Sequence, residues 1–177
     1  KESGQLDNTL VVFTSDQGFA WGQHGFQVKQ APYDANIRSP MIVSFPERFS
    51  KRSVCKHPIG GVDIVPTIFE VAGLELPWEM HGDSLVPLLK DPTQKEWNNP
   101  VLTVHTGDSY GSASNVVPVG DDEASRSKLY MSGDVPWWVS LVEADLKYIR
   151  TLVPGEPEEL YDLTDDPAEL VDVRRKR

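Results

Sequence analysis

The stretch that most constrains this chain is a short apolar run that ends abruptly in polar residues. Residues Thr9 to Thr14 (TLVVFT) are mostly β-branched, aliphatic or aromatic, which is typical of a strand covered on both faces, as in a parallel sheet. Asp16, Gln17 and Gly18 follow, and the glycine allows the backbone to turn sharply. Because ligands of open α/β sheets collect at strand ends of this kind, we expect a site at this turn.

Asp16 and Gln17 are candidate metal ligands. Together they carry three side-chain oxygens, the donor type that a hard cation such as calcium or magnesium prefers. Calcium takes about six to eight oxygens, so further ligands would come from elsewhere in the fold, from substrate or from another part of the protein. The alternative interpretation is that both residues cap a turn, a position that such side chains favour.

The residues that follow can hold anions, transfer protons or stack on rings, and their order is informative. Three short motifs resemble the sulfatase family of the alkaline-phosphatase-like superfamily: Ser15-Asp16-Gln17-Gly18, then Gly22-Gln23-His24-Gly25 with Lys29, and finally Arg38-Ser39-Pro40. The resemblance implies that Asp16 and Gln17 bind calcium, with magnesium less favoured. It also implies that Lys29 contacts the sulfate group or the leaving group.

Four other residues are candidates with structural alternatives. Residues 22–25, which include His24, resemble the Gly-x-His-Gly motif of a subset of sulfatases. His24 either takes a direct part in the site or holds the loop in its conformation. Trp21 either stacks on a sugar ring or packs beneath the loop. Arg38 either contacts substrate or pins the loop through a buried carboxylate. His105, at the end of a predicted strand, either lines the site or is a structural histidine.

Composition restricts the partners. The chain has 177 residues, enough for one domain with a core, and a net charge of -10, which argues against nucleic acid or an anionic membrane surface. An anionic substrate would be attracted by local charge, from Lys29, Arg38 and a protonated His24. The single cysteine, Cys55, excludes an internal disulfide, and no run approaches the roughly 18 apolar residues of a membrane span.

Two segments after the first stretch predict further elements of the core. Residues 40–45 (PMIVSF) predict a second strand in the same sheet, and residues 63–73 predict a capped helix, followed by a helical turn at residues 86–90. This part resembles a second sulfatase passage. The passage reads Asp-x-x-Pro-Thr, Ala-Gly, Pro and Gly-x-Ser-Leu, matched by Asp63, Pro66, Thr67, Ala72, Gly73, Pro77, Gly82, Ser84 and Leu85.

The C-terminal part predicts a small antiparallel sheet. Residues 137–142 and 147–152 predict a hairpin, and residues 158–163 a third segment, whereas residues 101–105, before this part, predict a further strand of the core. This part also resembles sulfatases, whose C-terminal subdomain is a small antiparallel sheet against a helix. Eight acidic residues and no basic one lie between Glu156 and Asp172, which we interpret as a solvated face.

The fold class that follows is α/β: part of an alkaline-phosphatase-like mixed sheet flanked by helices, with a small C-terminal antiparallel β subdomain and a helix. Residues 1–105 would form the C-terminal part of the core and carry half of the metal and sulfate site. Residues 106–133 predict a polar loop that is longer than ordinary connections. Residues 134–177 would form the subdomain.

The family's nucleophile is the feature that this chain lacks. Sulfatases of this family use an earlier pair of aspartates and a Cys or Ser in a Cys/Ser-x-Pro/Ala-x-Arg motif, oxidised to formylglycine. Cys55 does not fit because the residues after it lack the proline or alanine and the arginine. Ser44 to Arg48 matches the bare pattern, but it follows the metal motif and no Leu-Thr-Gly comes after it.

We therefore expect the C-terminal part of a sulfatase, acting on a sulfated small molecule or carbohydrate. Its formylglycine nucleophile would come from an N-terminal part outside this chain, and the isolated chain would be inactive. The alternatives are a phosphate or phosphonate ester hydrolase of the same superfamily and a fragment without catalytic function. The resemblance favours a periplasmic, secreted or lysosome-like compartment.

Overall fold

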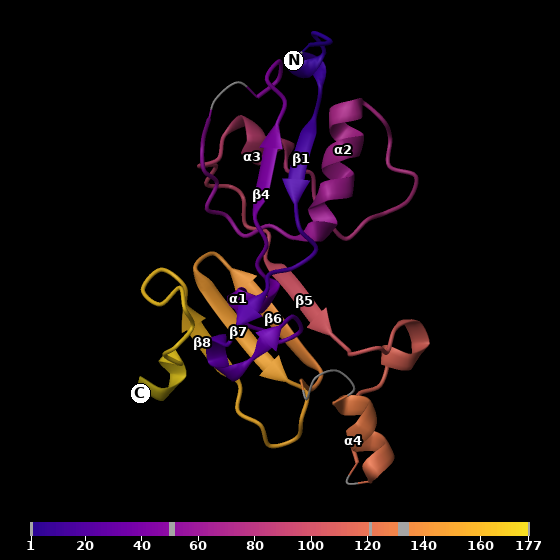
Figure 1. The fold of residues 1–177 in the computed structure, drawn as a ribbon, viewed down its shortest axis with the longest axis vertical. Coiled ribbons are helices and arrows are strands. Elements are labelled where there is room, and N and C mark those ends of the chain that lie inside the picture. The colour runs from indigo at the N-terminus through magenta and orange to yellow at the C-terminus, as the bar shows by residue number, and fades with distance from the viewer. Residues whose placement is uncertain (1, 50–51, 121, 131–134, 177) are drawn as a thin grey trace. The chain divides into compact units, whose positions relative to one another are not determined.

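The computed structural model describes residues 2–49, 52–120, 122–130 and 135–176 (Figure 1). Two units result from its backbone contacts: Lys1–Asp16 with Ser39–Pro100, and Gln17–Arg38 with Val101–Arg177. The predicted boundary at residue 105 differs from this division, because residues 101–105 pair with the C-terminal sheet. Predictions for Lys1, residues 131–134 and Arg177 concern positions outside the described residues.

The first unit contains a two-stranded antiparallel pair. Strand β1 (Val11–Thr14) pairs with β4 (Met41–Ser44), and Phe13 lies opposite Ile42. Phe13 and Ile42 are 59% and 61% exposed, so the strands are not covered on both faces as their apolar residues predicted. The residues of a strand show which side chains are apolar, but what covers each face depends on the segments that pack there.

Two helices pack against this pair through a small apolar core of Phe45, Val71 and Val86. Helix α2 (Ile64–Ala72) follows the 3-10 turn η3 (Gly61–Asp63), and α3 (Val86–Lys90) follows after an extended crossing, as Figure 1 shows. Gly73 ends α2 with φ of 69°, a left-handed conformation that glycine adopts without a steric cost. The predicted helix and helical turn are confirmed.

In the first unit, a set of hydrogen bonds joins α2 and the turn before it to the segment before α3. The Asp63 carboxylate accepts hydrogen bonds from the backbone amides of Gly60 and Asp83, at 2.8 and 2.9 Å. The buried Thr67 hydroxyl donates to the Asp63 carbonyl at 2.6 Å and accepts from the Leu85 amide at 2.8 Å. Much of the second family-like passage therefore consists of residues that connect one element to the next.

The second unit is organised by a four-stranded antiparallel sheet in the order β5-β6-β7-β8. Its strands are β5 (Val101–His105), β6 (Trp138–Glu143), β7 (Leu146–Thr151) and β8 (Glu159–Asp162). These bounds lie within one residue of the predicted strands at every end, so the predicted hairpin and third segment are confirmed. A 3-10 turn, η5 (Val173–Lys176), follows the last strand.

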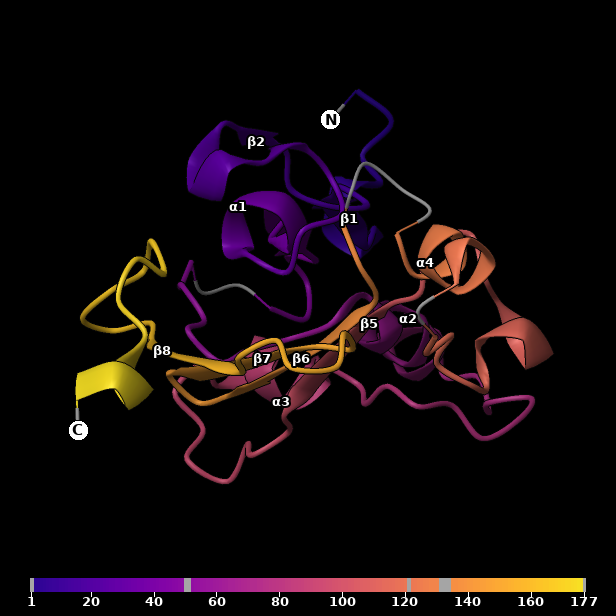
Figure 2. The same ribbon diagram turned by 90° about the horizontal axis from the view of Figure 1, so that it is seen from below.

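The segment 17–38 lies on one face of this sheet, and it carries most of the residues predicted for the site. It contains the short hairpin β2 (Ala20–Trp21) and β3 (Gln27–Val28), the turn η2 (Gln23–Gly25) and helix α1 (Asp34–Ile37). Figures 1 and 2 both show α1 over β6 and β7. Ala31 of this segment is fully buried with Val135 and Trp138.

The polar stretch predicted as a loop is partly helical. It contains η4 (Gly111–Ser114) and α4 (Glu123–Leu129). Asp122 is the N-cap of α4, its side chain accepts a hydrogen bond from the Ser125 amide at 2.9 Å, and the helix ends at the buried Leu129. An N-cap and one apolar anchor were enough to form the helix, although the local composition is polar.

None of the helices among the described residues is long and apolar enough to cross a membrane.

Candidate functional site

The turn after β1 presents the predicted metal ligands. Asp16 is exposed, accepts a hydrogen bond from the Ser15 hydroxyl at 3.1 Å, and is followed by the half-buried Gln17. A Cβ on Gly18 would lie 2.7 Å from the Arg38 carbonyl oxygen and 2.8 Å from that of Ala35. Glycine at this position therefore lets the chain pass against the end of α1.

The donors at this turn match calcium in kind but not in number. Carboxylate and amide oxygens suit a hard cation, but these two side chains supply fewer than the six to eight oxygens that calcium takes. Across the described residues, no group of three His, Cys, Asp or Glu side chains is placed to hold a metal ion. The metal role of Asp16 and Gln17 stays a prediction.

Lys29 lies between two residues with left-handed backbone conformations. Val28 has φ of 60° and Gln30 has φ of 90°. Such angles are unfavourable for residues other than glycine, and especially for a β-branched residue. The Val28 carbonyl accepts a hydrogen bond from Asn36 Nδ2 at 3.2 Å, and the Gln30 carbonyl accepts one from Trp138 Nε1 at 2.7 Å. A side chain of α1 thus holds the peptide before Lys29, and a side chain of β6 holds the peptide after Gln30.

His24 makes contacts of a kind that structure a loop. Its Nε2 lies 2.9 Å from the Ala168 carbonyl oxygen, a distance at which a protonated Nε2 donates a hydrogen bond. Its ring stacks on Tyr33 with 3.8 Å between ring centroids, and its backbone φ is 53°. These contacts support the alternative in which His24 orders the loop. A direct role of His24 in the reaction stays a prediction.

Trp21 does not pack beneath the loop. Its side chain is 82% exposed on the β2–β3 hairpin, with the Phe19 ring 4.9 Å away between centroids. An exposed indole is free to stack on a flat apolar face such as that of a sugar ring. Arg38 is also exposed, and its Nη1 lies 3.7 Å from Asp34 Oδ2 in an i,i+4 ion pair. Asp34 is only partly buried, so the role of Arg38 as a pin of the loop through a buried carboxylate stays a prediction, as does its contact with substrate.

His105 ends β5 and faces the interior of the second unit. Its ring stacks on Trp138 with 5.7 Å between centroids, and its buried Nε2 has no hydrogen-bond partner among the residues that the structure describes. Burial lowers the pKa of His105, and the nearby Asp108 charge opposes that shift. These contacts fit the structural alternative, and a role in substrate binding stays a prediction.

Sequence reasoning missed a buried charged cluster in this unit. Lys147 is fully buried, and its ammonium contacts the carboxylates of Asp34 and Glu169. Glu169 is only 2% exposed. The interpretation of the acidic stretch 156–172 as a solvated face is therefore wrong for this residue. A second carboxylate of that stretch, Glu159, accepts a hydrogen bond from the Tyr161 hydroxyl. The missed signal was the position of Lys147 two residues before Ile149 in a strand, because residues i and i+2 lie on the same face and Ile149 is buried.

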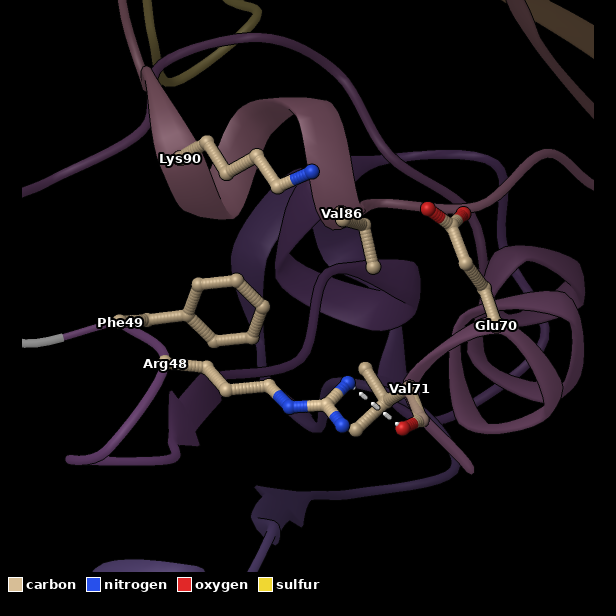
Figure 3. Close-up of a pocket in the computed structure, with 6 residues that line it drawn as sticks. All are labelled: Arg48, Phe49, Glu70, Val71, Val86 and Lys90. Carbon is tan, nitrogen blue, oxygen red and sulfur yellow. Dashed lines mark hydrogen bonds between the residues drawn. The ribbon is translucent and has the colours of Figure 1, made fainter. Parts of the chain in front are cut away.

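The residues that match a bare nucleophile pattern are used in packing. Phe45 is a core residue, and Arg48 Nη1 donates a hydrogen bond to the Val71 carbonyl at 2.8 Å while its guanidinium lies over the Phe45 ring. Figure 3 shows Arg48 in the wall of a cavity of about 280 Å³ in the first unit. The six residues lining this cavity include none of those predicted for the site: Arg48, Phe49, Glu70, Val71, Val86 and Lys90. Cys55 is an exposed free thiol.

Comparison with known proteins identifies the family of the chain. Residues 22–113 match the family described as N-sulphoglucosamine sulphohydrolase, C-terminal. The chain is 38% identical over 96 residues to N-acetylglucosamine-6-O-sulfatase of Bacteroides thetaiotaomicron, which covers 53% of this chain. It is 30% identical to arylsulfatase K of Xenopus laevis across 97% of its own length. The chain therefore belongs to the sulfatase family.

These relatives are much longer than the chain. It spans 17% of the Bacteroides enzyme and 29% of the Xenopus enzyme. Over 99% of its length it also superposes, with a TM-score of 0.69 and 27% identity, on a solved structure described as a complex with its substrate D-glucosamine-2-N,6-O-disulfate. The chain covers 32% of that structure. The alkaline-phosphatase-like fold class is thereby confirmed.

A phosphonate monoester hydrolase of Agrobacterium radiobacter has a similar fold, with a TM-score of 0.71 over 98% of this chain. Its sequence identity is 23%. That likeness concerns the fold alone, since hydrolases of one fold carry out different reactions.

Proposed function

We propose that the chain is the C-terminal part of a sulfatase that hydrolyses a sulfate ester of a carbohydrate to an alcohol and free sulfate. The observation that carries the proposal is the backbone around Lys29, where two left-handed residues are each held by a side-chain hydrogen bond. Unfavourable backbone angles persist only where the surroundings hold them, and they are common at functional sites. Membership of the sulfatase family supports the same conclusion.

Lys29 would bind the sulfate group. Hydrolysis of a sulfate ester develops negative charge on the sulfate oxygens and on the leaving oxygen, and a positioned cation stabilises that charge. The lysine ammonium is compact and has three donors, so it can contact one sulfate oxygen or the bridging oxygen. A fixed backbone on both sides limits the places that this ammonium can reach.

Asp16 and Gln17 would contribute two oxygens to a calcium site. Bound calcium supplies Lewis-acid polarisation of a sulfate oxygen and orients the reacting groups. The Asp16 carboxylate would supply a charged ligand and the Gln17 amide a neutral oxygen. The nucleophile, which the family resemblance gives as formylglycine, and the other metal ligands would come from residues outside this chain.

Trp21 would contact the sugar. Its exposed indole lies on the same hairpin that leads to Lys29, so a carbohydrate bound through its sulfate at Lys29 would be near the hairpin. Two of the related proteins are named for glucosamine substrates: an N-acetylglucosamine-6-O-sulfatase and the protein bound to D-glucosamine-2-N,6-O-disulfate. A sulfated glucosamine is therefore the first substrate to test.

The test is the substitution Lys29→Ala in the full-length protein, assayed on an aryl sulfate and on glucosamine 6-sulfate. Loss of a positioned donor to developing charge typically lowers kcat by about 10²–10³-fold, and loss of a full positive charge should do at least as much. Lys128→Ala, on the exposed face of α4, is the matched control and should leave kcat unchanged.

Three outcomes would count against the proposal. Unchanged turnover in Lys29→Ala would remove Lys29 from the site. Faster turnover of an aryl phosphonate than of the aryl sulfate by the unsubstituted protein would favour the phosphonate ester hydrolase. Absence of any turnover by the full-length protein would favour a fragment or relative without catalytic function.

A further inference from the structure

The fully buried Lys147 is the centre of a charged cluster in the second unit. Its Nζ lies 2.7 Å from Asp34 Oδ1 and 2.6 Å from Glu169 Oε1. Burying an ammonium is costly unless it is paired, and here one cation meets two carboxylates. Burial raises the pKa of Glu169, while the Lys147 charge and hydrogen bonds to the carboxylate oppose that shift. Such a cluster is expected to hold its members in one arrangement.

Glu169 links this cluster directly to the start of α1. Its Oε2 accepts a hydrogen bond from the Asp34 backbone amide at 2.6 Å, while its Oε1 contacts Lys147. The residue before α1, Tyr33, makes no side-chain cap. The Glu169 carboxylate thus takes over the capping role from a distant part of the chain, satisfying an amide that the helix cannot satisfy itself.

The same C-terminal residues hold both ends of the loop that carries Lys29. At one end, the Ala168 carbonyl oxygen lies 2.9 Å from His24 Nε2, and at the other end Glu169 holds Asp34. Between them, α1 supplies Asn36, whose Nδ2 holds the Val28 carbonyl. A continuous path of contacts therefore runs from Lys147 and Glu169 through α1 to the peptide before Lys29.

We propose that Glu169 and Lys147 are positioning residues that fix the loop carrying Lys29 for the reaction. Neither residue needs to touch substrate, because Glu169 acts through α1 and Lys147 acts through Glu169 and Asp34. The effect on turnover rests on the proposed function, whereas the effect on the loop rests on these contacts alone. The acidic C-terminal stretch thereby gains a role in placing the site.

The test uses Glu169→Ala in the full-length protein, with two readouts. Hydrogen exchange of the α1 amides of Asn36 and Arg38 should be at least about tenfold faster, because the helix loses its cap. The kcat should fall by about 10- to 100-fold with a smaller change in KM, as expected when a catalytic group moves by about 1 Å. Exchange within α2, in the other unit, should not change.

Three further variants make the result specific. Glu169→Gln keeps an acceptor for the Asp34 amide and should recover most of the exchange protection and part of kcat. Glu169→Met fills the space without an acceptor, and it replaces Glu169→Ala if that protein does not fold. Arg150→Met removes an exposed ion pair to Glu158 from the same strand and should leave both readouts unchanged.

Wild-type exchange in α1 of Glu169→Ala or Glu169→Met would overturn the proposal. Equal acceleration of exchange in α1 and α2 would also overturn it, because the residue would then act on general stability. If Lys29→Ala has no effect on turnover, the proposed function fails, and the exchange readout still decides whether Glu169 positions the loop. Unchanged kcat in Glu169→Ala, alongside a large loss in Lys29→Ala, would overturn the positioning role, because the reaction at Lys29 would then not depend on Glu169.

Discussion

At the scale of single residues, the position of Lys29 depends on the backbone of its neighbours. Each non-glycine residue in an unfavourable backbone region costs on the order of 1–3 kcal/mol, and Val28 and Gln30 are both in such regions. The hydrogen bonds from Asn36 and Trp138 and the burial of Ala31 offset that cost. The side chain that we propose for sulfate binding is therefore placed by residues with no reaction chemistry of their own.

The lowered pKa of His105 predicts a specific pH dependence of stability. With a folded-state pKa below the ordinary value, the unfolded chain binds a proton first as the pH falls below about 6.5. His105 is neutral in both states at higher pH, so its contribution destabilises the fold only as the pH falls through that range. We expect the thermal midpoint to fall between pH 7.5 and 5.5, and to fall less in His105→Gln.

The measurement is thermal unfolding of both proteins across that pH range. Replacement of the exposed His81 by glutamine serves as the control and should leave the slope as in the unsubstituted protein. Equal slopes for His105→Gln and the unsubstituted protein would show that burial of His105 does not control its protonation.

At the scale of elements, the family-like passage between Asp63 and Leu85 connects α2 to the segment before α3 by hydrogen bonds. Thr67 on α2 bonds to the Leu85 amide just before α3, and Asp63 bonds to the Asp83 amide. Gly82 lies against the backbone of η3. A Cβ at Gly82 would be 2.1 Å from the Val62 carbonyl oxygen. This passage has a structural explanation that does not involve substrate.

We expect Gly82→Ala to lower the free energy of unfolding by about 1–3 kcal/mol or more, because a methyl group there must displace backbone. Gly61→Ala is the matched control in the same unit, since a Cβ at Gly61 meets no atom within 4 Å. Denaturant unfolding of the two variants and the unsubstituted protein measures the difference. Similar stability of the two variants would mean that the Gly82 backbone can move away at little cost.

At the scale of the whole molecule, each unit leaves an apolar sheet face exposed. Phe13 and Ile42 are exposed on the β1–β4 pair, and Leu102 and Val104 are exposed on β5. Contiguous exposed apolar side chains are typical of a surface that another segment covers. Under the proposed function, that segment is the part of the sulfatase that precedes this chain.

We expect the isolated chain to hydrolyse no aryl sulfate and to bind calcium weakly, with a dissociation constant above about 10⁻³ M, because it supplies too few oxygens. An aryl sulfate assay and calorimetric titration with calcium check these two expectations. Asp16→Asn should remove what calcium binding remains. Turnover by the isolated chain would mean that the nucleophile lies within it, and tight calcium binding would mean that it holds a complete metal site.

Local sequence patterns predicted the elements that are specified by residues close together in the chain. Residues 147–152 alternate between covered and open positions, and β7 formed within a residue of the predicted bounds. Gly73 predicted the end of α2 because a left-handed residue there favours glycine. Helix α4 was missed because its cap and single buried leucine are weak signals within a polar stretch.

The sequence by itself determined the family, the strands and helices with strong periodicity, and the choice of Asp16, Gln17 and Lys29 as candidates, since these depend on residue type and order. The tertiary structure decided which acidic residues are buried, that residues 101–105 join the C-terminal sheet, and that Glu169 caps α1. Those features depend on residues that are distant in the chain, such as Val101 and Val142, which pair in the sheet, and Asp34 and Lys147, which are more than a hundred positions apart. No local pattern specifies such a pairing, because it exists only once the segment 17–38 has packed on the sheet.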